Sequence, residues 1–351
     1  MKRSSRRYGK WLLLGLILLL PITMMWVVAS HPLPTGRSLE HSRRLPATKG
    51  VPYYHGGVQG YVWLDARTVR QVDSVSNATL DIKDTDVETG TVRKIASYPK
   101  GKEGGFISQQ LFHLSPDRKW QLFTGFTTST VMSLSAKPAL VQTPLNKPGV
   151  LNKPTTILQV AAWMPDSLHW LELSEDKSGN SLLLVHTLDG KIVQRIVVPG
   201  VAQWRTLLGV TEHGAALVGE NIAKQGQGPR MKYLEVNIKT GQTTENTALN
   251  QVSSLQNPEI YTPVLSPKGD RLAWATRHNP GLLIGILRML RHKPQTARYE
   301  ISSCRLDGSQ LHGVDNVECQ GREEVEMMDW LPDNQQISFT FRDTLYTAPV
   351  D

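Results

Sequence analysis

The sequence predicts an all-β fold, a six-bladed β-propeller of four-stranded blades, preceded by one N-terminal transmembrane helix. Three observations lead to this prediction. A strand–turn–strand motif recurs about every fifty residues, a second hairpin follows it in the same units, and one uncharged apolar run lies near the N-terminus. The chain has 351 residues, 40% of them hydrophobic and 20% charged. This ordinary globular composition excludes a disordered chain, a collagen-like fibre and a polytopic membrane protein.

The first recurring motif is an apolar strand, a tight polar turn and another apolar strand. One copy reads HLSPDRKWQLF over residues 113–123, and another reads VLSPKGDRLAW over residues 264–274. Proline fixes the backbone φ angle at the first central position of the turn, and Asp, Asn or Gly completes the turn. The copies lie 47 to 65 residues apart, and their landmarks are Asp65, Asp117, Asp166, His213, Lys268 and Asp333. The first and fourth copies lack the proline.

The second motif lies downstream in the same units and is an alternating strand that ends in a glycine turn. Its tightest forms are Asp189-Gly190 and Asp307-Gly308, and Asp-Gly between alternating apolar strands is a strong hairpin signal. Each unit therefore holds about four strands. Because such a sheet cannot bury both faces alone, neighbouring sheets must stack, and six stacked sheets close as a propeller.

The last unit is short, because only eighteen residues follow Asp333. They suffice for the second and third strands of a blade but not for the fourth. We expect the segment Val51–His55 to supply the missing outer strand by pairing with the C-terminal strand Thr344–Pro349.

The turns resemble those of a known repeat. Those that contain Ser115, Trp163, Ser266 and Trp330 are similar to the WD40-like (PD40-type) repeats of TolB-like six-bladed propellers, over roughly residues 58–351. The resemblance implies the fold. It implies no single function, because scaffolds, ligand binders and accessory domains of enzymes share that fold.

Tryptophans recur at repeat-related positions. Trp63, Trp163 and Trp330 immediately precede the first turn of their units. Their recurrence indicates packing between blades rather than a platform for sugar rings.

The first thirty residues predict membrane targeting. Residues 1–10 form a basic tip, and residues 11–30 contain no charged side chain. Twenty helical residues span about 30 Å, the thickness of a hydrocarbon core, and Trp11 and Trp26 suit the two membrane interfaces. A cleaved signal peptide is the alternative, but the apolar run is longer than such signals use. We expect a signal-anchor with a cytoplasmic N-terminus.

In either case the rest of the chain lies outside the cytoplasm, periplasmic or extracellular. Residues 31–50 contain three prolines and two glycines and are expected to be a linker, and residues 51–351 form the propeller. The formal net charge is +8, but five of the bases lie in the first ten residues, so the chain beyond residue 30 carries only +3. We therefore expect no nucleic-acid partner.

The interval between the last two landmarks is the longest, and residues 278–294 (HNPGLLIGILRMLRHKP) account for the excess. If they are helical, the apolar residues share one face, and the C-terminal end is basic. Such a helix suits a membrane surface or a partner protein. An insertion folded against its own blade is the alternative. The predicted partner-binding residues are Leu282, Leu283, Ile286, Leu287, Arg288, Leu290 and Arg291.

Cys304 and Cys319 are the two cysteines of the chain, with fourteen residues between them. Outside the cytoplasm we expect them to form a disulfide. Two buried free thiols are the alternative.

The sequence contains no Gly-x-Ser-x-Gly, no His-Glu-x-x-His, no phosphate loop and no Gly-x-Gly-x-x-Gly after a strand. We predict no catalytic residue, metal site or cofactor. The predicted function is a membrane-anchored, extracytoplasmic propeller that acts as a non-catalytic protein-binding or scaffolding module for an envelope or extracellular protein. The alternative is an envelope enzyme, a glycan or peptide hydrolase or lyase, with its site in the central channel, where a small ligand could also bind.

Overall fold

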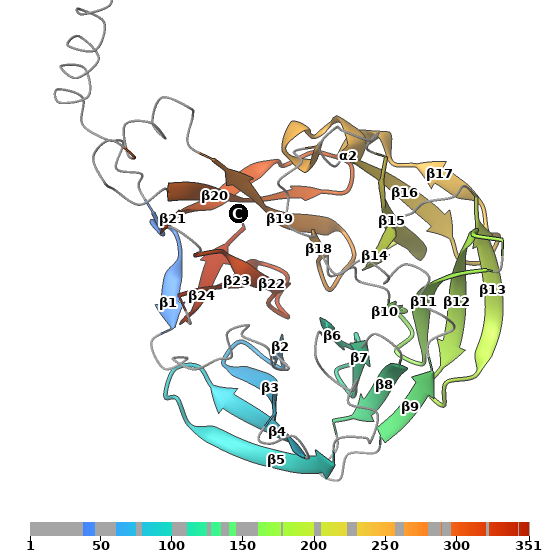
Figure 1. The fold of residues 1–351 in the computed structure, drawn as a ribbon, viewed down its shortest axis with the longest axis horizontal. Helices are drawn as coiled ribbons and strands as arrows, with labels where there is room; N and C mark the ends of the chain where they lie inside the picture. Colours follow the sequence, from blue (N-terminus) through green and yellow to red (C-terminus); the bar gives the residue numbers. More distant parts are fainter. Residues whose placement is uncertain are drawn as a thin grey trace, which may run out of the picture.

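The computed structural model describes residues 38–45, 61–74, 79–99, 111–124, 128–134, 140–144, 161–176, 178–199, 205–222, 230–256, 263–279, 289, 296–320, 323–342 and 344–350. They form six four-stranded antiparallel sheets arranged around a ring (Figure 1). The prediction of a six-bladed propeller with four-stranded blades is confirmed.

The six blades follow one another along the chain. Blade 1 consists of β2 (Tyr61–Trp63), β3 (Thr68–Ser74), β4 (Thr79–Asp86) and β5 (Val92–Pro99), and blade 2 of β6 (Leu111–Leu114), β7 (Trp120–Thr124), β8 (Thr128–Ser133) and β9 (Leu140–Pro144). Blade 3 consists of β10 (Ala161–Trp163), β11 (His169–Glu175), β12 (Ser181–Thr187) and β13 (Ile192–Val198), and blade 4 of β14 (Arg205–Val210), β15 (Ala215–Asn221), β16 (Met231–Asn237) and β17 (Thr243–Glu245). Blade 5 consists of β18 (Val264–Leu265), β19 (Arg271–His278), β20 (Thr296–Arg305) and β21 (His312–Gln320). Blade 6 consists of β22 (Glu326–Trp330), β23 (Gln336–Phe341), β24 (Thr344–Pro349) and β1 (Arg43–Leu45). Helix α2 (Thr247–Gln251) and the 3₁₀ helix η3 (Ser253–Gln256) follow blade 4.

The first turn of each blade folds as its sequence predicts. In five blades the fourth turn residue has a positive φ, and its N–H donates to the carbonyl of the first; these residues are Arg118, Ser167, Gly214, Gly269 and Asn334. The turn carboxylate then accepts from the backbone that follows, as Asp117 does from the N–H of Lys119. Blade 1 lacks the proline, and Asp65 there accepts from the N–H groups of Arg67 and Thr68.

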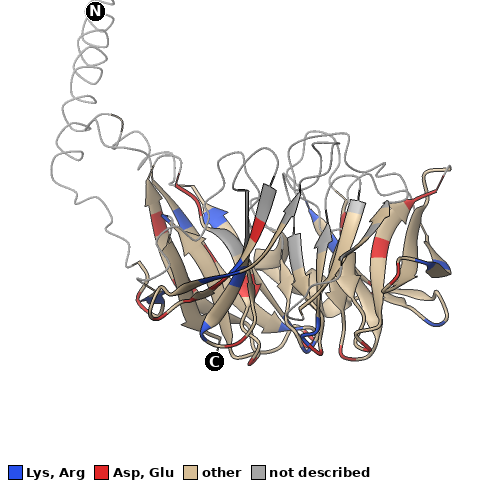
Figure 2. Ribbon diagram, turned by 90° about the horizontal axis from the view of Figure 1, so that it is seen from below, with Lys and Arg blue, Asp and Glu red and all other residues tan. Residues whose placement is uncertain are grey.

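The antiparallel order gives the ring two different ends. The turns that join the first to the second strand and the third to the fourth lie at one end, which we call the turn face. The connections from the second to the third strand, and from one blade to the next, lie at the other end, which we call the loop face. In Figure 2 the turn face is at the bottom, where the C-terminus also lies.

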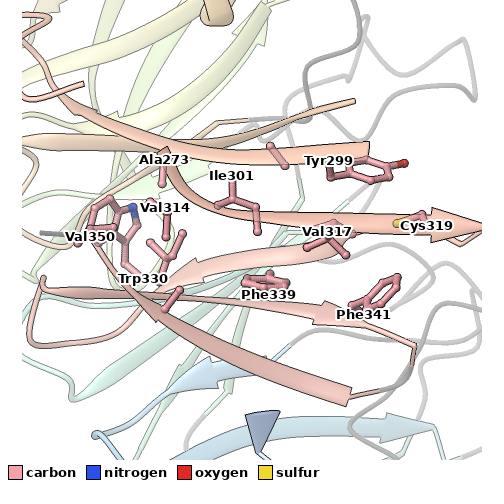
Figure 3. Packing of buried hydrophobic residues seen from close by; sticks show 14 of the residues in the cluster. Ala273, Tyr299, Ile301, Val314, Val317, Cys319, Trp330, Phe339, Phe341 and Val350 are labelled. Carbon is pink, nitrogen blue, oxygen red and sulfur yellow. The ribbon is translucent and has the colours of Figure 1, made fainter. Parts of the chain in front are cut away.

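The hydrophobic core is divided among the seams between blades. Along the second strand of a blade, successive side chains face opposite neighbours, so Leu272 packs with blade 4 and Ala273 with blade 6. One of these clusters joins blades 5 and 6, and Figure 3 shows Ile301 and Val317 on one side of it and Phe339 and Phe341 on the other. Each seam thus buries apolar surface that one sheet could not bury alone.

The tryptophans that precede the first turns bind neighbouring blades, as predicted. Their indole N–H groups all donate to the preceding blade: Trp63 to Ser338 Oγ, Trp163 to the carbonyl of His113 and Trp330 to the carbonyl of Val264.

The ring closes with an N-terminal strand on the C-terminal one, but the segment differs from the predicted one. Strand β1 pairs with β24, Arg43 opposite Thr347 and Leu45 opposite Leu345. The closing strand therefore lies inside the range that we expected to be a linker, and Val51–His55 lies outside the described residues.

The predicted disulfide is wrong: Cys304 and Cys319 are buried free thiols. The hairpin of β20 and β21 explains why, because Cys319 pairs with Ala297, seven residues along β20 from Cys304. At about 3.4 Å per residue the two cysteines are roughly 24 Å apart, far beyond the reach of a disulfide.

Two predicted features fall on residues that are not described. Trp11 and Trp26 of the expected anchor lie there, and so do Leu282, Leu283, Ile286, Leu287, Arg288, Leu290 and Arg291 of the expected partner-binding stretch. Within the described part of the chain, no helix is long and apolar enough to cross a membrane. The interval that contains the second stretch joins β19 to β20 at the loop face.

Candidate functional site

The candidate site is a pocket of about 340 Å³ on the turn face, between blades 4 and 5. Turns of both blades and the start of α2 surround it. Its lining residues are Thr211, Glu212, His213, Glu235, Glu245, Asn246, Thr247, Ala248, Asp270, Arg305, Leu306 and Asp307. Five of these carry carboxylates and one carries a guanidinium, so the pocket is acidic.

Asn246 fixes the shape of the pocket by joining its two blades. As the N-cap of α2, its Oδ1 accepts from the N–H of Leu249 at 2.9 Å. Its Nδ2 donates to Glu235 Oε1 at 2.7 Å and to the carbonyl of Leu306, in blade 5, at 3.1 Å. The side chain therefore holds the helix start, one pocket carboxylate and the turn of the next blade together.

A backbone contact supports the pocket next to its lining turns. The N–H of Glu212 donates to the carbonyl of Gly269 at 3.0 Å. Gly269 has a φ of +73°, and a Cβ there would lie 2.5 Å from the carbonyl oxygen of Val210. The turns of blades 4 and 5 can approach this closely only because that residue is glycine.

Hydrogen bonds favour the anionic form of three of the pocket carboxylates. A hydrogen bond from Lys232 lowers the pKa of Glu245, and one from the hydroxyl of Ser309 lowers the pKa of Asp307. Burial alone would raise the pKa of Asp270, but hydrogen bonds from Ser266 and Asn334 together lower it.

This arrangement suits the binding of a cation better than general-acid catalysis. A general acid must hold a proton near neutral pH, and every pocket carboxyl with a resolved pKa shift is shifted the other way. In the described ranges, no group of three or more His, Cys, Asp or Glu side chains is placed to hold a metal ion. The chemistry on offer is recognition of a positively charged group.

One carboxyl outside the pocket has a raised pKa. Desolvation raises the pKa of Asp329, in the innermost strand of blade 6, to about 7. Its carboxylate accepts from the N–H of Trp330 at 2.8 Å, and it lies next to Tyr61, whose pKa burial raises well above the usual value. Asp329 belongs to the seam between blades 6 and 1.

A titratable pair is also buried in the seam between blades 2 and 3. His186 Nε2 lies 2.8 Å from Glu172 Oε2, and the His186 ring stacks on Trp170 with centroids 4.0 Å apart. The side chains of His186 and Glu172 are 1% and 3% exposed. At that depth the pair serves packing and does not meet a ligand at the surface.

Sequence reasoning missed the pocket as a site, although it quoted several of its residues. Asp270, Arg305 and Asp307 stand in the recurring turns, and His213 is a landmark of the repeat. The signal that could have found them is a cluster of acidic residues in the first turns of adjacent units and in the second turn of one of them.

Comparison with known proteins adds similarity of fold. No protein-family model matches the chain, and no curated protein matches it. Among solved structures, TolB from Acinetobacter baumannii is similar with 13% identity and a TM-score of 0.47, over 84% of this chain and 65% of that one. The chain thus spans slightly less than two thirds of that protein. A putative TolB from Agrobacterium tumefaciens has 15% identity and a TM-score of 0.42, over 76% of this chain and 78% of that one.

An oligogalacturonate lyase from Vibrio parahaemolyticus is also similar, with 9% identity and a TM-score of 0.46 over 88% of this chain and 93% of that one. At these identities the similarity concerns the fold and not the activity. The six four-stranded sheets of this chain are the architecture that the likeness to TolB-like six-bladed propellers predicted.

Proposed function

We propose that this chain is a membrane-anchored, extracytoplasmic β-propeller that binds a protein partner without making or breaking covalent bonds. The observation that carries the proposal is the pocket between blades 4 and 5, which is lined by five carboxylates, three of them favoured as anions by hydrogen bonds. The partner that fits it is a protein segment with an exposed Lys or Arg.

The geometry favours recognition of an extended basic side chain. The pocket opens at the surface, and Glu212, Glu245 and Asp307 are exposed there. Ion pairs at such exposed positions are individually weak, but several around one pocket attract a cation and select against an anion. Arg305 is the cation that the partner would have to accommodate.

The membrane anchor is supported by sequence alone. Residues 11–30 are uncharged and follow five bases, which favours an N-terminus in the cytoplasm and a propeller on the other side. The partner is therefore a protein of the cell envelope or the extracellular space.

Site-specific crosslinking in native membranes tests the proposal. A photo-crosslinking residue replaces Thr247, which is exposed and lines the pocket, or Thr89, which is exposed on the turn face of blade 1. We expect one protein to crosslink from position 247 and not from position 89, and to be lost when Glu212→Gln and Asp307→Asn remove two pocket charges. Identical crosslinks from both positions, unaffected by the charge changes, would contradict the proposal.

The enzyme alternative is favoured by Asp329, a carboxyl in the innermost strand of blade 6 whose desolvation raises its pKa to about 7, in the range that suits a general acid near neutral pH. Chromogenic glycosides and peptides incubated with the chain and with an Asp329→Asn variant test it. Turnover that the variant loses, while it retains its fold, would favour the enzyme.

A further inference from the structure

The segment that precedes β1 lies along the outer edge of blade 5. The N–H of Leu39 donates to the carbonyl of Asn316 at 2.8 Å, and the hydroxyl of Ser38 accepts from the N–H of Glu318 at 3.0 Å. This segment is therefore fixed on β21 before the chain reaches blade 6.

Asp315 is the main anchor of the segment. Its carboxylate accepts from the N–H groups of Glu40 and His41, both at 3.2 Å, and from the hydroxyl of Ser42. Asp315 is 3% exposed, so these charge-assisted hydrogen bonds are shielded from water. We call Ser38–Ser42 and Asp315 together the latch.

The latch also fixes the direction in which the chain leaves the propeller. From Ser42 back to Ser38 the segment moves along β21 from Asp315 to Glu318, toward the end of the strand at Gln320. Gln320 pairs with Thr296, the first residue of β20, so this end belongs to the loop face. The described part of the chain therefore begins, at Ser38, toward the loop-face end of blade 5.

The length of the chain before the latch limits the orientation of the propeller relative to the membrane. Eight residue steps separate Ser30 from Ser38, and at about 3.4 Å each they span at most roughly 27 Å. The turn-face end of β21, at His312, is six residues from Glu318, or about 20 Å. If the turn face pointed toward the membrane, the chain between Ser30 and Ser38 would need most of its length just to run along blade 5.

We infer that the propeller stands with the loop face of blades 5 and 6 against the lipid bilayer and with the turn face, and hence the acidic pocket, pointing away from it. This inference rests on the membrane anchor of the proposed function. The interval after β19 begins next to the same corner, because His278 pairs with Arg298 and Arg298 with Glu318. The sequence of that interval is apolar and basic, as expected of a segment that suits a membrane surface.

Depth-dependent fluorescence quenching tests the orientation. The full chain is reconstituted in phosphatidylcholine–phosphatidylglycerol vesicles that contain a nitroxide-labelled lipid. A thiol-reactive fluorophore is attached after Gln320→Cys at the loop face or Leu311→Cys at the turn face, two exposed positions at opposite ends of β21. Native Cys304 and Cys319, both 1% exposed, stay unlabelled in the folded protein.

We expect the fluorophore at position 320 to be quenched several-fold more than the one at position 311. Stronger quenching at position 311, or quenching at neither position while the chain floats with the vesicles, would overturn the orientation. A chain that does not float at all would instead overturn the proposed anchor. Flotation thus separates failure of the anchor from failure of the orientation.

A variant of the latch tests whether the latch sets this orientation. Asp315→Ala removes the acceptor that holds Glu40, His41 and Ser42, so the difference in quenching between positions 320 and 311 should shrink while flotation is unchanged. Asp333→Asn, an exposed turn residue of blade 6, is the matched control and should leave the difference intact. An unchanged difference in the Asp315→Ala variant would show that the latch does not set the orientation.

Discussion

The indole N–H of Trp63, in the first strand of blade 1, donates a hydrogen bond of 2.7 Å to the hydroxyl of Ser338, in the second strand of blade 6. The hydroxyl of Tyr61 lies 2.9 Å from the same oxygen. Tyr61, Trp63 and Ser338 are at most 5% exposed. The ring is therefore closed twice, by the pairing of β1 with β24 and by a buried polar contact between its first and last blades.

Ser338→Ala should destabilise the propeller by about 1–3 kcal/mol, because it leaves the buried Trp63 indole without its acceptor. Chemical unfolding measures this loss. Ser309→Ala is the control, since Ser309 is exposed and its hydroxyl donates to the adjacent Asp307, and it should change the free energy of unfolding by less than about 0.5 kcal/mol. Equal effects of the two changes would contradict this account of the seam.

Gly269→Ala should be more destabilising than Gly214→Ala. Both glycines end equivalent turns with φ near +75°, so each change costs about 1 kcal/mol of backbone strain. A Cβ at 269 also meets backbone atoms of residues 210–212, whereas one at 214 has open space around it. Unfolding free energies of the two variants provide the comparison, and similar losses would mean that the close approach beneath the pocket is unimportant.

Stability should fall as the pH rises through the pKa of Asp329. Burial raises that pKa from 3.8 to about 7, so the folded state holds the proton more tightly than the unfolded state does. The favourable contribution is complete below about pH 4 and is lost between pH 4 and pH 7, with a size on the order of 2–4 kcal/mol. Asp329→Asn should remove this dependence.

Unfolding of the wild type and of the Asp329→Asn variant at pH 5 and pH 8 tests that expectation. Asp333→Asn, at an exposed turn position of the same blade, is the control and should behave like the wild type. If the Asp329→Asn variant lost as much stability as the wild type between these pH values, another group would be responsible.

Reducing agents should leave the thermal stability unchanged, because Cys304 and Cys319 are unpaired. Burial raises the pKa of each thiol to about 12, which makes both slow to react in the folded protein. Titration with a thiol reagent should therefore find two thiols only after denaturation. A mass that increases on reduction and alkylation, but not on alkylation alone, would show a disulfide instead.

The turns and the blade count could be predicted from the sequence, because both depend on local chemistry. Proline and Asp at fixed positions set the first turn, and glycine sets the second, whatever the neighbouring blade does. The positive φ angles at Arg118, Ser167 and Asn334 follow from that local geometry.

The closing strand could not be found in this way. Arg43–Leu45 has three residues and no alternation of apolar side chains, and its place depends on β24, some three hundred residues away. The disulfide prediction was wrong for a related reason, because the short separation of the two cysteines in sequence does not give the register of the hairpin that contains them.

The pocket escaped prediction because no single unit of the repeat contains it. Glu235 and Glu245 come from blade 4, and Asp270 and Asp307 come from blade 5. A single repeat also does not show which seam a polar residue faces. Arg70 of blade 1 and Gln121 of blade 2 both lie on second strands and face the seam between these two blades. In other seams, second-strand positions hold apolar residues such as Leu171 and Leu272.

Affinity for peptides of graded charge is the most direct test of the central claim that the turn-face pocket binds a basic protein segment. Peptides of equal length, from acidic to basic, are titrated against the full chain in detergent and against its Glu212→Gln, Asp307→Asn variant. The account predicts tightest binding by basic peptides, weakening with salt and in the variant. Binding that ignores the sign of the peptide charge, or that survives loss of the two carboxylates unchanged, would contradict it.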